Sequence, residues 1–122
     1  MEQYHGACHC GAVSFDFSAE PVTSGIRCNC SFCKRKGSVL SPFTLSPNEI
    51  TINAESGSLG LYQFDSKIAK HYFCTTCGIN PFLESMLEPG NFRVNLGCID
   101  KIDTFEIAVK TFDGKNLLSQ IY

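Results

Sequence analysis

Cys28, Cys30 and Cys33 are the residues of this sequence most able to do chemistry, because they bring three thiols within six residues. The spacing is C-x-C followed by C-x-x-C, and an ordinary strand or helix cannot point all three side chains one way. It therefore predicts a tight loop that closes on one metal ion. Zinc is the expected ion, since it accepts tetrahedral thiolate ligation. Three protein ligands leave a fourth position open, which is typical of a catalytic site.

Four further cysteines predict a second metal site. Cys8 and Cys10 are two residues apart, so an extended backbone would present both on one side, and Gly11 would permit the chain to turn. Cys74 and Cys77 form the C-x-x-C-G motif of the chain. We expect these four thiols to bind one structural zinc that ties the start of the chain to its middle. The alternative is two independent redox dithiols, but no thioredoxin-like βαβ pattern surrounds the second pair.

The eight cysteines would also allow four disulfides. Disulfides require an oxidising compartment. Residues 1–5 have no positively charged start followed by an apolar run, so we expect no signal peptide and a cytoplasmic location. Short paired intervals that recur far apart along the chain favour metal knuckles over disulfides.

An open fourth position at Cys28, Cys30 and Cys33 has competing interpretations. Cys98 or His71 could complete a closed structural site, and an empty or redox-active cluster is a further alternative. Cys98 lies on the apolar face of an alternating segment, where a free cysteine is a common core residue. His71 could instead line the site as a proton carrier, because histidine titrates near neutral pH.

Two other features near the cysteines have ordinary explanations. His9 lies between two expected ligands. For His9 and for His71, an exposed or core-satisfied histidine is a more common outcome than a ligand. Residues 34–36, Lys-Arg-Lys, could neutralise a thiolate-rich site or hold a substrate carboxylate. A solvated charge run explains them equally well.

The elements that must position these residues are short strands. Period-2 alternation of apolar side chains indicates an all-β fold, and no stretch of eleven residues has a helical period. The proline of residues 39–45 confines that segment to a sheet edge or a bulge, and residues 46–49 predict a single helical turn. The expected strands are residues 12–17, 24–28, 39–45, 50–52, 59–64, 67–74, 82–86, 92–98 and 105–110, with a turn at 65–66.

Length and charge limit the possible partners. The 122 residues are expected to form a single domain, residues 1–122, with a buried core. The net charge of −2 gives no basic field for nucleic acid or an anionic membrane. No apolar run approaches the roughly 20 residues of a membrane helix. We therefore expect neither nucleic acid nor membrane as a partner.

Four motifs, in order, resemble the glutathione-dependent formaldehyde-activating enzyme family, which also includes centromere protein V. The match runs from about Gly6 to Asp103. It implies an Mss4-like fold, the β-tent of folded β-sheets with zinc knuckles. It also implies a structural zinc on Cys8, Cys10, Cys74 and Cys77 and an active-site zinc on Cys28, Cys30 and Cys33. The four motifs are residues 8–15, 28–33, 71–78 and 94–100.

The resemblance implies a zinc-dependent carbon–sulfur lyase, similar to S-(hydroxymethyl)glutathione synthase, that combines a thiol such as glutathione with formaldehyde or another small aldehyde. A free thiol has a pKa of about 8.5, and coordination to zinc deprotonates it. The same ion could polarise an aldehyde oxygen. The alternative is a non-catalytic zinc-binding interaction module, because no Asp or Glu accompanies the cysteine loop.

Overall fold

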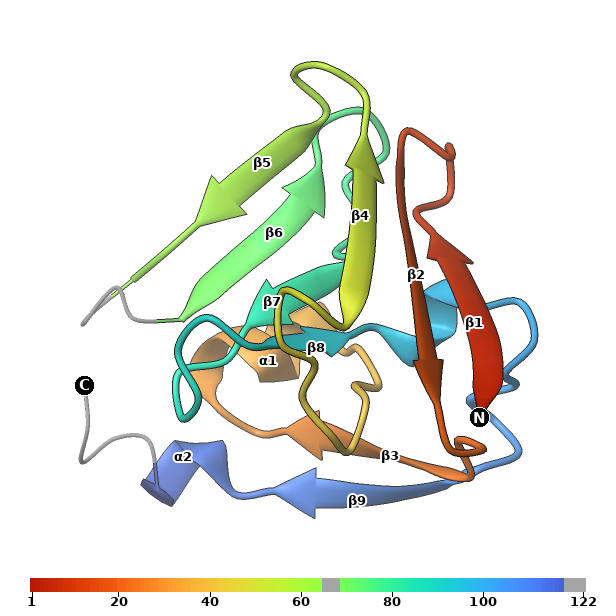
Figure 1. Cartoon of the computed structure of the whole chain (residues 1–122). Helices are drawn as coiled ribbons and strands as arrows, with labels where there is room; N and C mark the ends of the chain where they lie inside the picture. Colours follow the sequence, from red (N-terminus) through yellow and green to blue (C-terminus); the bar gives the residue numbers. More distant parts are fainter. Residues whose placement is uncertain (65–68, 118–122) are drawn as a thin grey trace.

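Short β-strands make up most of the regular secondary structure in this computed structural model, which describes residues 1–64 and 69–117 (Figure 1). Two short α-helices and one turn of 3-10 helix complete it. The elements are β1 (Glu2–Ala7), β2 (Val13–Ala19), β3 (Ser24–Cys28), α1 (Ser31–Lys36), β4 (Ile50–Ala54), β5 (Leu59–Tyr62), β6 (Lys70–Cys74), β7 (Phe82–Glu84), β8 (Phe92–Val94), η1 (Leu96–Cys98), β9 (Ala108–Phe112) and α2 (Gly114–Leu117).

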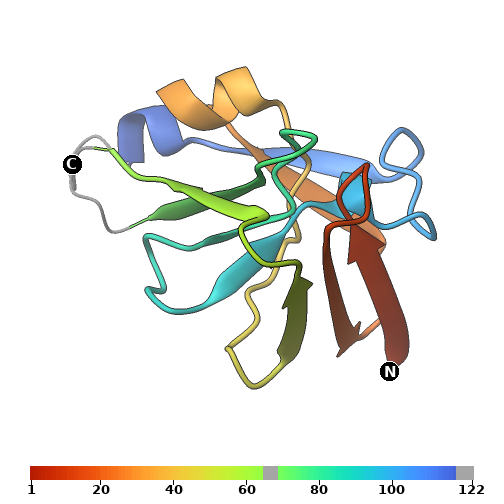
Figure 2. The same cartoon turned by 90° about the horizontal axis from the view of Figure 1, so that it is seen from above.

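The strands form three sheets in the described part of the chain. An antiparallel sheet has the order β1-β2-β4, a second has the order β5-β6-β7-β8, and β3 pairs in parallel with β9. The two antiparallel sheets stand side by side, with β3 and β9 running beneath them (Figure 1). Seen from above, α1, α2 and the β3–β9 pair lie along one edge (Figure 2). The all-β prediction with several folded sheets is confirmed.

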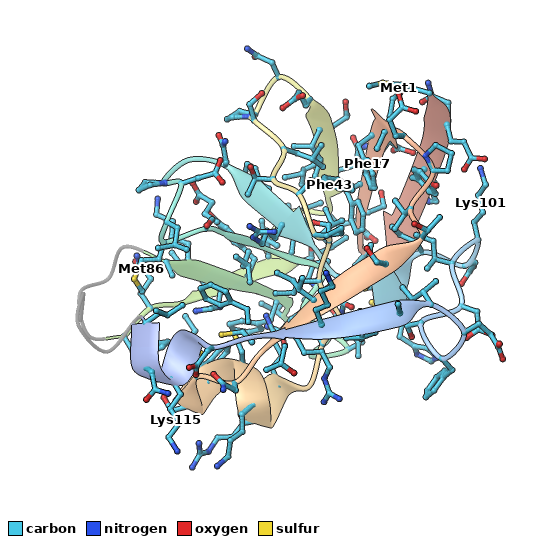
Figure 3. All side chains as sticks on the ribbon, turned by 90° about the horizontal axis from the view of Figure 1, so that it is seen from below. Met1, Phe17, Phe43, Met86, Lys101 and Lys115 are labelled. Atoms are coloured by element: carbon cyan, nitrogen blue, oxygen red, sulfur yellow. The ribbon has the colours of Figure 1, made fainter. Side chains whose placement is uncertain are left out.

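The core lies where the two antiparallel sheets meet. Alternate residues of β2 are buried, as the sequence predicts, and Phe15 meets Phe82 of β7 edge to face with ring centroids 6.1 Å apart. Phe17 meets Phe43 edge to face at 6.1 Å (Figure 3). Gly6 leaves room for this packing, because a Cβ there would lie 2.2 Å from Cζ of Phe15. Burial of these aromatic rings drives the sheets together.

Several predicted strands have different bounds in the structure. Residues 39–45 form only isolated bridges, at Leu40 and Leu45. The strand predicted over 92–98 ends at Val94, because the Asn95 side chain accepts a hydrogen bond from the Gly97 amide at 3.0 Å and starts η1. Residues 105–107 lie outside β9, and the strand predicted over 82–86 ends at Glu84, so residues 85–86 lie beyond β7.

Other parts of the prediction missed elements or lie partly outside the described residues. β1 and the two short helices had no predicted counterpart. Residues 65–68 lie outside the described part, so the predicted turn at 65–66 and the start of the strand at 67–74 do too. The single turn over 46–49 is present, with the Ser46 amide donating to Oε1 of Glu49 at 2.8 Å. Within residues 1–64 and 69–117, no helix has the length and apolar character needed to cross a membrane.

Candidate metal centres

Four thiols from two distant turns converge in what we call the four-cysteine cluster: Cys8, Cys10, Cys74 and Cys77. Their sulfur atoms all lie within 4.8 Å of one another. The Sγ of Cys10 is 3.7 Å from that of Cys8 and 3.6 Å from that of Cys74. Tetrahedral zinc with Zn–S bonds of about 2.3 Å would hold its sulfurs about 3.8 Å apart. The cluster therefore has the donor atoms and the spacing to hold one zinc ion.

Two tight turns shape this cluster. Residues 8–10 form a turn rather than the expected extended segment, and Gly11 follows with φ of 85°. Gly78 ends the other turn with φ of 78°. Positive φ is costly for other residues, so glycine allows the backbone to wrap the sulfurs. Backbone hydrogen bonds from Cys10 and then Ile79 lower the pKa of the Cys77 thiol to about 6.

Cys28, Cys30 and Cys33 form the three-cysteine cluster, with all three sulfurs within 4.8 Å of one another. The predicted tight loop is in fact a strand-to-helix junction. Cys28 ends β3, Cys30 caps α1, and Cys33 lies in the first turn of the helix with its amide donating to Cys30 Sγ at 3.4 Å. Gly37 ends the helix in a left-handed conformation. The helix has six residues, too few for a sequence period to reveal it.

The electrostatics of the three-cysteine cluster favour a bound cation. Hydrogen bonds from Cys28 and then Cys33 lower the pKa of Cys30. The hydrogen bond with Cys30 raises the pKa of Cys28, and hydrogen bonds with Cys28 and then Cys30 raise the pKa of Cys33, because these two thiols hold the protons. Three adjacent sulfurs cannot all ionise unless a positive charge lies between them. The donor set suits zinc, and a tetrahedral ion would have one position left for another ligand.

One member of the charge run at residues 34–36 differs from the others. Lys34 and Arg35 are exposed, as a solvated run predicts. Lys36 is half-buried, and its Nζ lies 5.6 Å from the centroid of the Phe32 ring. Burial lowers the pKa of Lys36, and the negative charge available at Cys33 opposes that change. Lys36 is therefore the residue of the run that can neutralise the thiols.

The three-cysteine cluster forms one wall of a pocket of about 80 Å³, which we call the thiol pocket. The sheet β5-β6-β7-β8 forms the wall that carries His71, Leu83 and Arg93. His71 pairs with Leu83 across β6 and β7, and Leu83 pairs with Arg93 across β7 and β8. Directly opposed residues of antiparallel strands share a face, so these three side chains form a row.

The wall formed by the three-cysteine cluster is held in place by residues at the end of β9 and just after it. The Asn29 side chain, between two of the cysteines, donates to Oδ1 of Asp113 at 3.1 Å and accepts from the Lys115 amide at 2.8 Å. Met86 packs with Cys28 and Phe112 on the side where α1 and α2 approach each other (Figure 3). The junction is thus fixed by segments more than 80 residues apart in sequence.

His71 is buried in the thiol pocket, with 4% of its surface exposed. Neither ring nitrogen has a hydrogen-bond partner among the described residues. Its ring packs on Phe32 with centroids 4.2 Å apart. Burial, followed by the charge of Lys36, lowers the pKa of His71 to about 4, so the ring is neutral at physiological pH. Its nitrogens are not among the ligand atoms grouped with the three sulfurs, and its role as a proton carrier stays a prediction.

Cys98 lies beside the four-cysteine cluster. It lines a separate pocket with Cys8, Cys10 and the exposed His9. Burial, followed by the charge of Cys8, raises the pKa of Cys98 to about 12. The alternative in which Cys98 completes the three-cysteine cluster does not fit this placement.

The sequence interpretation missed two residues that shape the thiol pocket. In the strand predicted over 92–98, Arg93 alternates with apolar residues, and the face that carries it proves to be a pocket wall. Asn29 is the intervening residue of the C-x-C motif, and the motif assigns it no role. No local pattern marks either residue, because their partners come from other parts of the chain.

Comparison with known proteins places this geometry in context. Residues 3–115 match the model of a family described as glutathione-dependent formaldehyde-activating enzyme. The crystal structure of a Rhodobacter sphaeroides protein, a structural-genomics target, is similar to this chain with a TM-score of 0.76 and 31% sequence identity. The similarity covers 88% of this chain and 99% of that one.

Proposed function

The chain belongs to the glutathione-dependent formaldehyde-activating enzyme family, and on this premise we propose that it is a zinc-dependent carbon–sulfur lyase. It would combine a small thiol, such as glutathione, with a small aldehyde, such as formaldehyde. The observation that supports this most is the meeting of three thiols and a buried neutral His71 in one pocket. The four-cysteine cluster would hold a structural zinc, and the three-cysteine cluster an active-site zinc.

The reaction needs no redox cofactor. A bond forms between the thiol sulfur and the carbonyl carbon, the carbonyl π pair moves to oxygen, and the proton of the thiol ends on that oxygen. Zinc at the three-cysteine cluster would supply an open position at which a thiol loses its proton at neutral pH. The remaining requirements are a path for that proton and a site that excludes water.

His71 suits the proton path. A neutral imidazole offers one nitrogen that accepts and one that donates, and both are unpartnered among the described residues. We assign His71 to carry the proton from the thiol toward the developing hydroxyl. Leu40 and Leu83 line the same pocket and would keep bulk water away, which strengthens the electrostatic interactions inside it.

All eight cysteines are free thiols in the structure. A chain that depends on seven thiolate ligands and a thiol substrate is best served by a reducing compartment. We therefore infer a cytoplasmic location for this protein.

Titration of the zinc-loaded protein with glutathione tests the proposal. X-ray absorption at the zinc edge should show an additional sulfur ligand, and NMR exchange spectroscopy should show formaldehyde entering and leaving the glutathione adduct faster than without protein. Cys30→Ser is the matched variant that should lose both effects. Absence of glutathione binding at millimolar concentration, together with exchange at the uncatalysed rate, would contradict the proposed activity.

A further inference from the structure

We propose that the thiol pocket selects a short reactant that carries a carboxylate, and that the guanidinium of Arg93 binds this carboxylate. The inference rests on the proposed function, in which a thiol and an aldehyde meet in this pocket. It adds a substrate class, reactants with a carboxylate close to the reacting thiol or carbonyl group, to which neither glutathione nor formaldehyde belongs. The carboxylate can belong to the thiol or to the aldehyde, and the experiment below separates the two sources.

The first observation is where the sheet places Arg93. The register of β6, β7 and β8 puts His71, Leu83 and Arg93 in one row. Neighbouring strands are about 4.8 Å apart, so the backbone positions of the two polar residues are separated by roughly 10 Å. The row thus presents a cation at one end, an apolar side chain in the middle and a neutral imidazole at the other end. The three-cysteine cluster lines the same pocket.

The second observation is that Arg93 retains free donors. One terminal nitrogen donates to the Ser41 carbonyl at 2.9 Å, which anchors the side chain. Ser41 is itself fully buried, and its hydroxyl accepts a hydrogen bond from the Val94 amide at 3.1 Å. The Glu88 carboxylate acts on Arg93 electrostatically, but among residues 1–64 and 69–117 no carboxylate lies within ion-pair distance of the guanidinium. A guanidinium has five N–H donors in a planar fork that matches a carboxylate, so most of them remain available.

The third observation is the unsatisfied His71. It is more than nine-tenths buried, lines the pocket and has no hydrogen-bond partner in the described part of the chain. Buried polar atoms are almost always paired. We therefore expect a bound molecule to supply the missing hydrogen-bond partner of His71. The oxygen or sulfur atom that pairs with His71 would lie at one end of the row, and the carboxylate of the same molecule would lie at the other end, at Arg93.

The size of the pocket sets the length of the reactant. A volume of about 80 Å³ holds several waters, since one needs about 10–15 Å³ on this measure. It is far below the 300 Å³ or more of pockets that enclose drug-sized ligands. A whole glutathione cannot be enclosed, whereas a two-carbon acid fits. The thiol or aldehyde group of such an acid and its carboxylate would both lie inside the pocket.

Binding of matched thiols to the zinc-loaded protein tests the inference without measuring activity. Mercaptoacetate and mercaptoacetamide have the same heavy-atom skeleton and differ in charge. By calorimetry, mercaptoacetate should bind roughly tenfold to a hundredfold more tightly, the range expected for a hydrogen-bonded charge pair. Arg93→Gln should remove that preference while both thiols still bind measurably, which also shows that the pocket is folded. Arg35→Gln is the control, because Arg35 is an exposed arginine that also donates a hydrogen bond to a backbone carbonyl, that of Ser31. This variant should change neither the affinity for mercaptoacetate nor that for mercaptoacetamide.

A second pair of probes tests the aldehyde as the source of the carboxylate. With glutathione present, adduct exchange of glyoxylate is compared with that of glycolaldehyde, each corrected for its uncatalysed rate. A preference for the acid that Arg93→Gln abolishes, in either pair, supports the inference. If Arg93→Gln does not fold, Arg93→Lys should retain part of the preference because it keeps the charge.

The outcomes against the inference differ from those against the proposed function. Equal and measurable binding of both thiols, with equal exchange of both aldehydes, overturns the role of Arg93 and leaves the lyase proposal standing. Failure of both thiols to bind overturns the open metal position and the inference with it.

Discussion

The two cysteine clusters use the same donor atom in different settings. The four-cysteine cluster joins a turn after β1 to a turn after β6, and its sulfurs come from positions up to 69 residues apart. The three-cysteine cluster draws all its sulfurs from residues 28–33, and it opens onto the thiol pocket. An ion in the first cross-links two sheets. An ion in the second cross-links only neighbouring residues of a junction that β9 and α2 already support.

This difference separates stability from chemistry. A long-range cross-link restricts the unfolded chain and holds the sheets together, whereas a local one does little for the fold. A complete set of four thiolates leaves no position for a substrate, whereas three leave one. The unsatisfied His71 and the available donors of Arg93 are also found at the second cluster. The following variants test this contrast, from the largest expected effect to the smallest.

Cys77→Ser should have the largest effect, because it removes one ligand of the cross-linking ion. Structural zinc contributes about 10–16 kcal/mol in small peptides, as much as the net stability of many domains. We expect insoluble or unfolded protein, measured by circular dichroism and by elemental analysis of zinc. Cys98→Ser makes the same chemical change beside the cluster but not within it, and it should leave folding and zinc content unchanged. A well-folded Cys77→Ser protein with normal thermal stability would show that this cluster does not hold the fold together.

Cys30→Ser should abolish adduct exchange while the domain stays folded. The serine hydroxyl is a poor replacement for a thiolate in a zinc site, so the protein should lose one of the two expected ions. Elemental analysis and circular dichroism of the same preparation measure the loss of zinc and the retained fold. If Cys30→Ser unfolds as completely as Cys77→Ser, the two clusters are both structural and the contrast between them fails.

The sequence predicted which cysteines meet in each cluster. The short intervals at residues 8–10, 28–33 and 74–77 are local signals, and the joining of the first and last of these was inferred from their recurrence along the chain. It also predicted β2, whose alternation follows from one buried face. It did not predict α1, since six residues are too few to show a period. The alternation at residues 105–109 pointed to a half-buried strand, yet Phe105 is 96% exposed and β9 begins later. The parallel pairing of β3 and β9 depends on partners more than 80 residues apart, which no local pattern encodes.

The same limit applies to the thiol pocket. The neighbours of His71 and Arg93 are set by strand register across three strands, and a one-residue shift would turn each side chain to the opposite face. The sequence left the role of His71 open between ligand, core residue and proton carrier, and the fold brings it to the pocket. Family resemblance extended the prediction where local patterns ended, and the match over residues 3–115 confirms that resemblance.

His71→Phe should change the pH dependence of stability. Burial lowers the pKa of His71 to about 4, below the ordinary value of about 6.5. The unfolded chain therefore binds a proton between these pH values that the folded chain does not, and the folded state loses stability as pH falls from 6.5 toward 4. At pH 5 this amounts to roughly 2 kcal/mol, and it is absent above pH 7.

Urea unfolding of wild type and His71→Phe at pH 7.5 and pH 5 measures this pH-dependent contribution of His71 to the free energy of unfolding. Zinc release at low pH affects both proteins, so the difference between them isolates the histidine. Phenylalanine also preserves the packing on Phe32. His9→Phe makes the same substitution at an exposed position and serves as the matched control. An equal loss of stability in wild type and His71→Phe would mean that His71 is charged or partnered in the folded protein.

Asn29→Ala should have the smallest effect and is specific to the three-cysteine cluster. Asn29 links the junction to Asp113 and Lys115 by two side-chain hydrogen bonds, which contribute about 1 kcal/mol each. Their loss should lower the free energy of unfolding by roughly 1–2 kcal/mol and speed the removal of one zinc by a chelator, because the three sulfurs are held less firmly. Asn116→Ala removes another hydrogen bond to Asp113, at 2.9 Å, and leaves in place the two hydrogen bonds made by the Asn29 side chain. It should leave zinc release unchanged. If both variants release zinc at the same rate, Asn29 does not position the cysteines, and the junction is rigid through α1 alone.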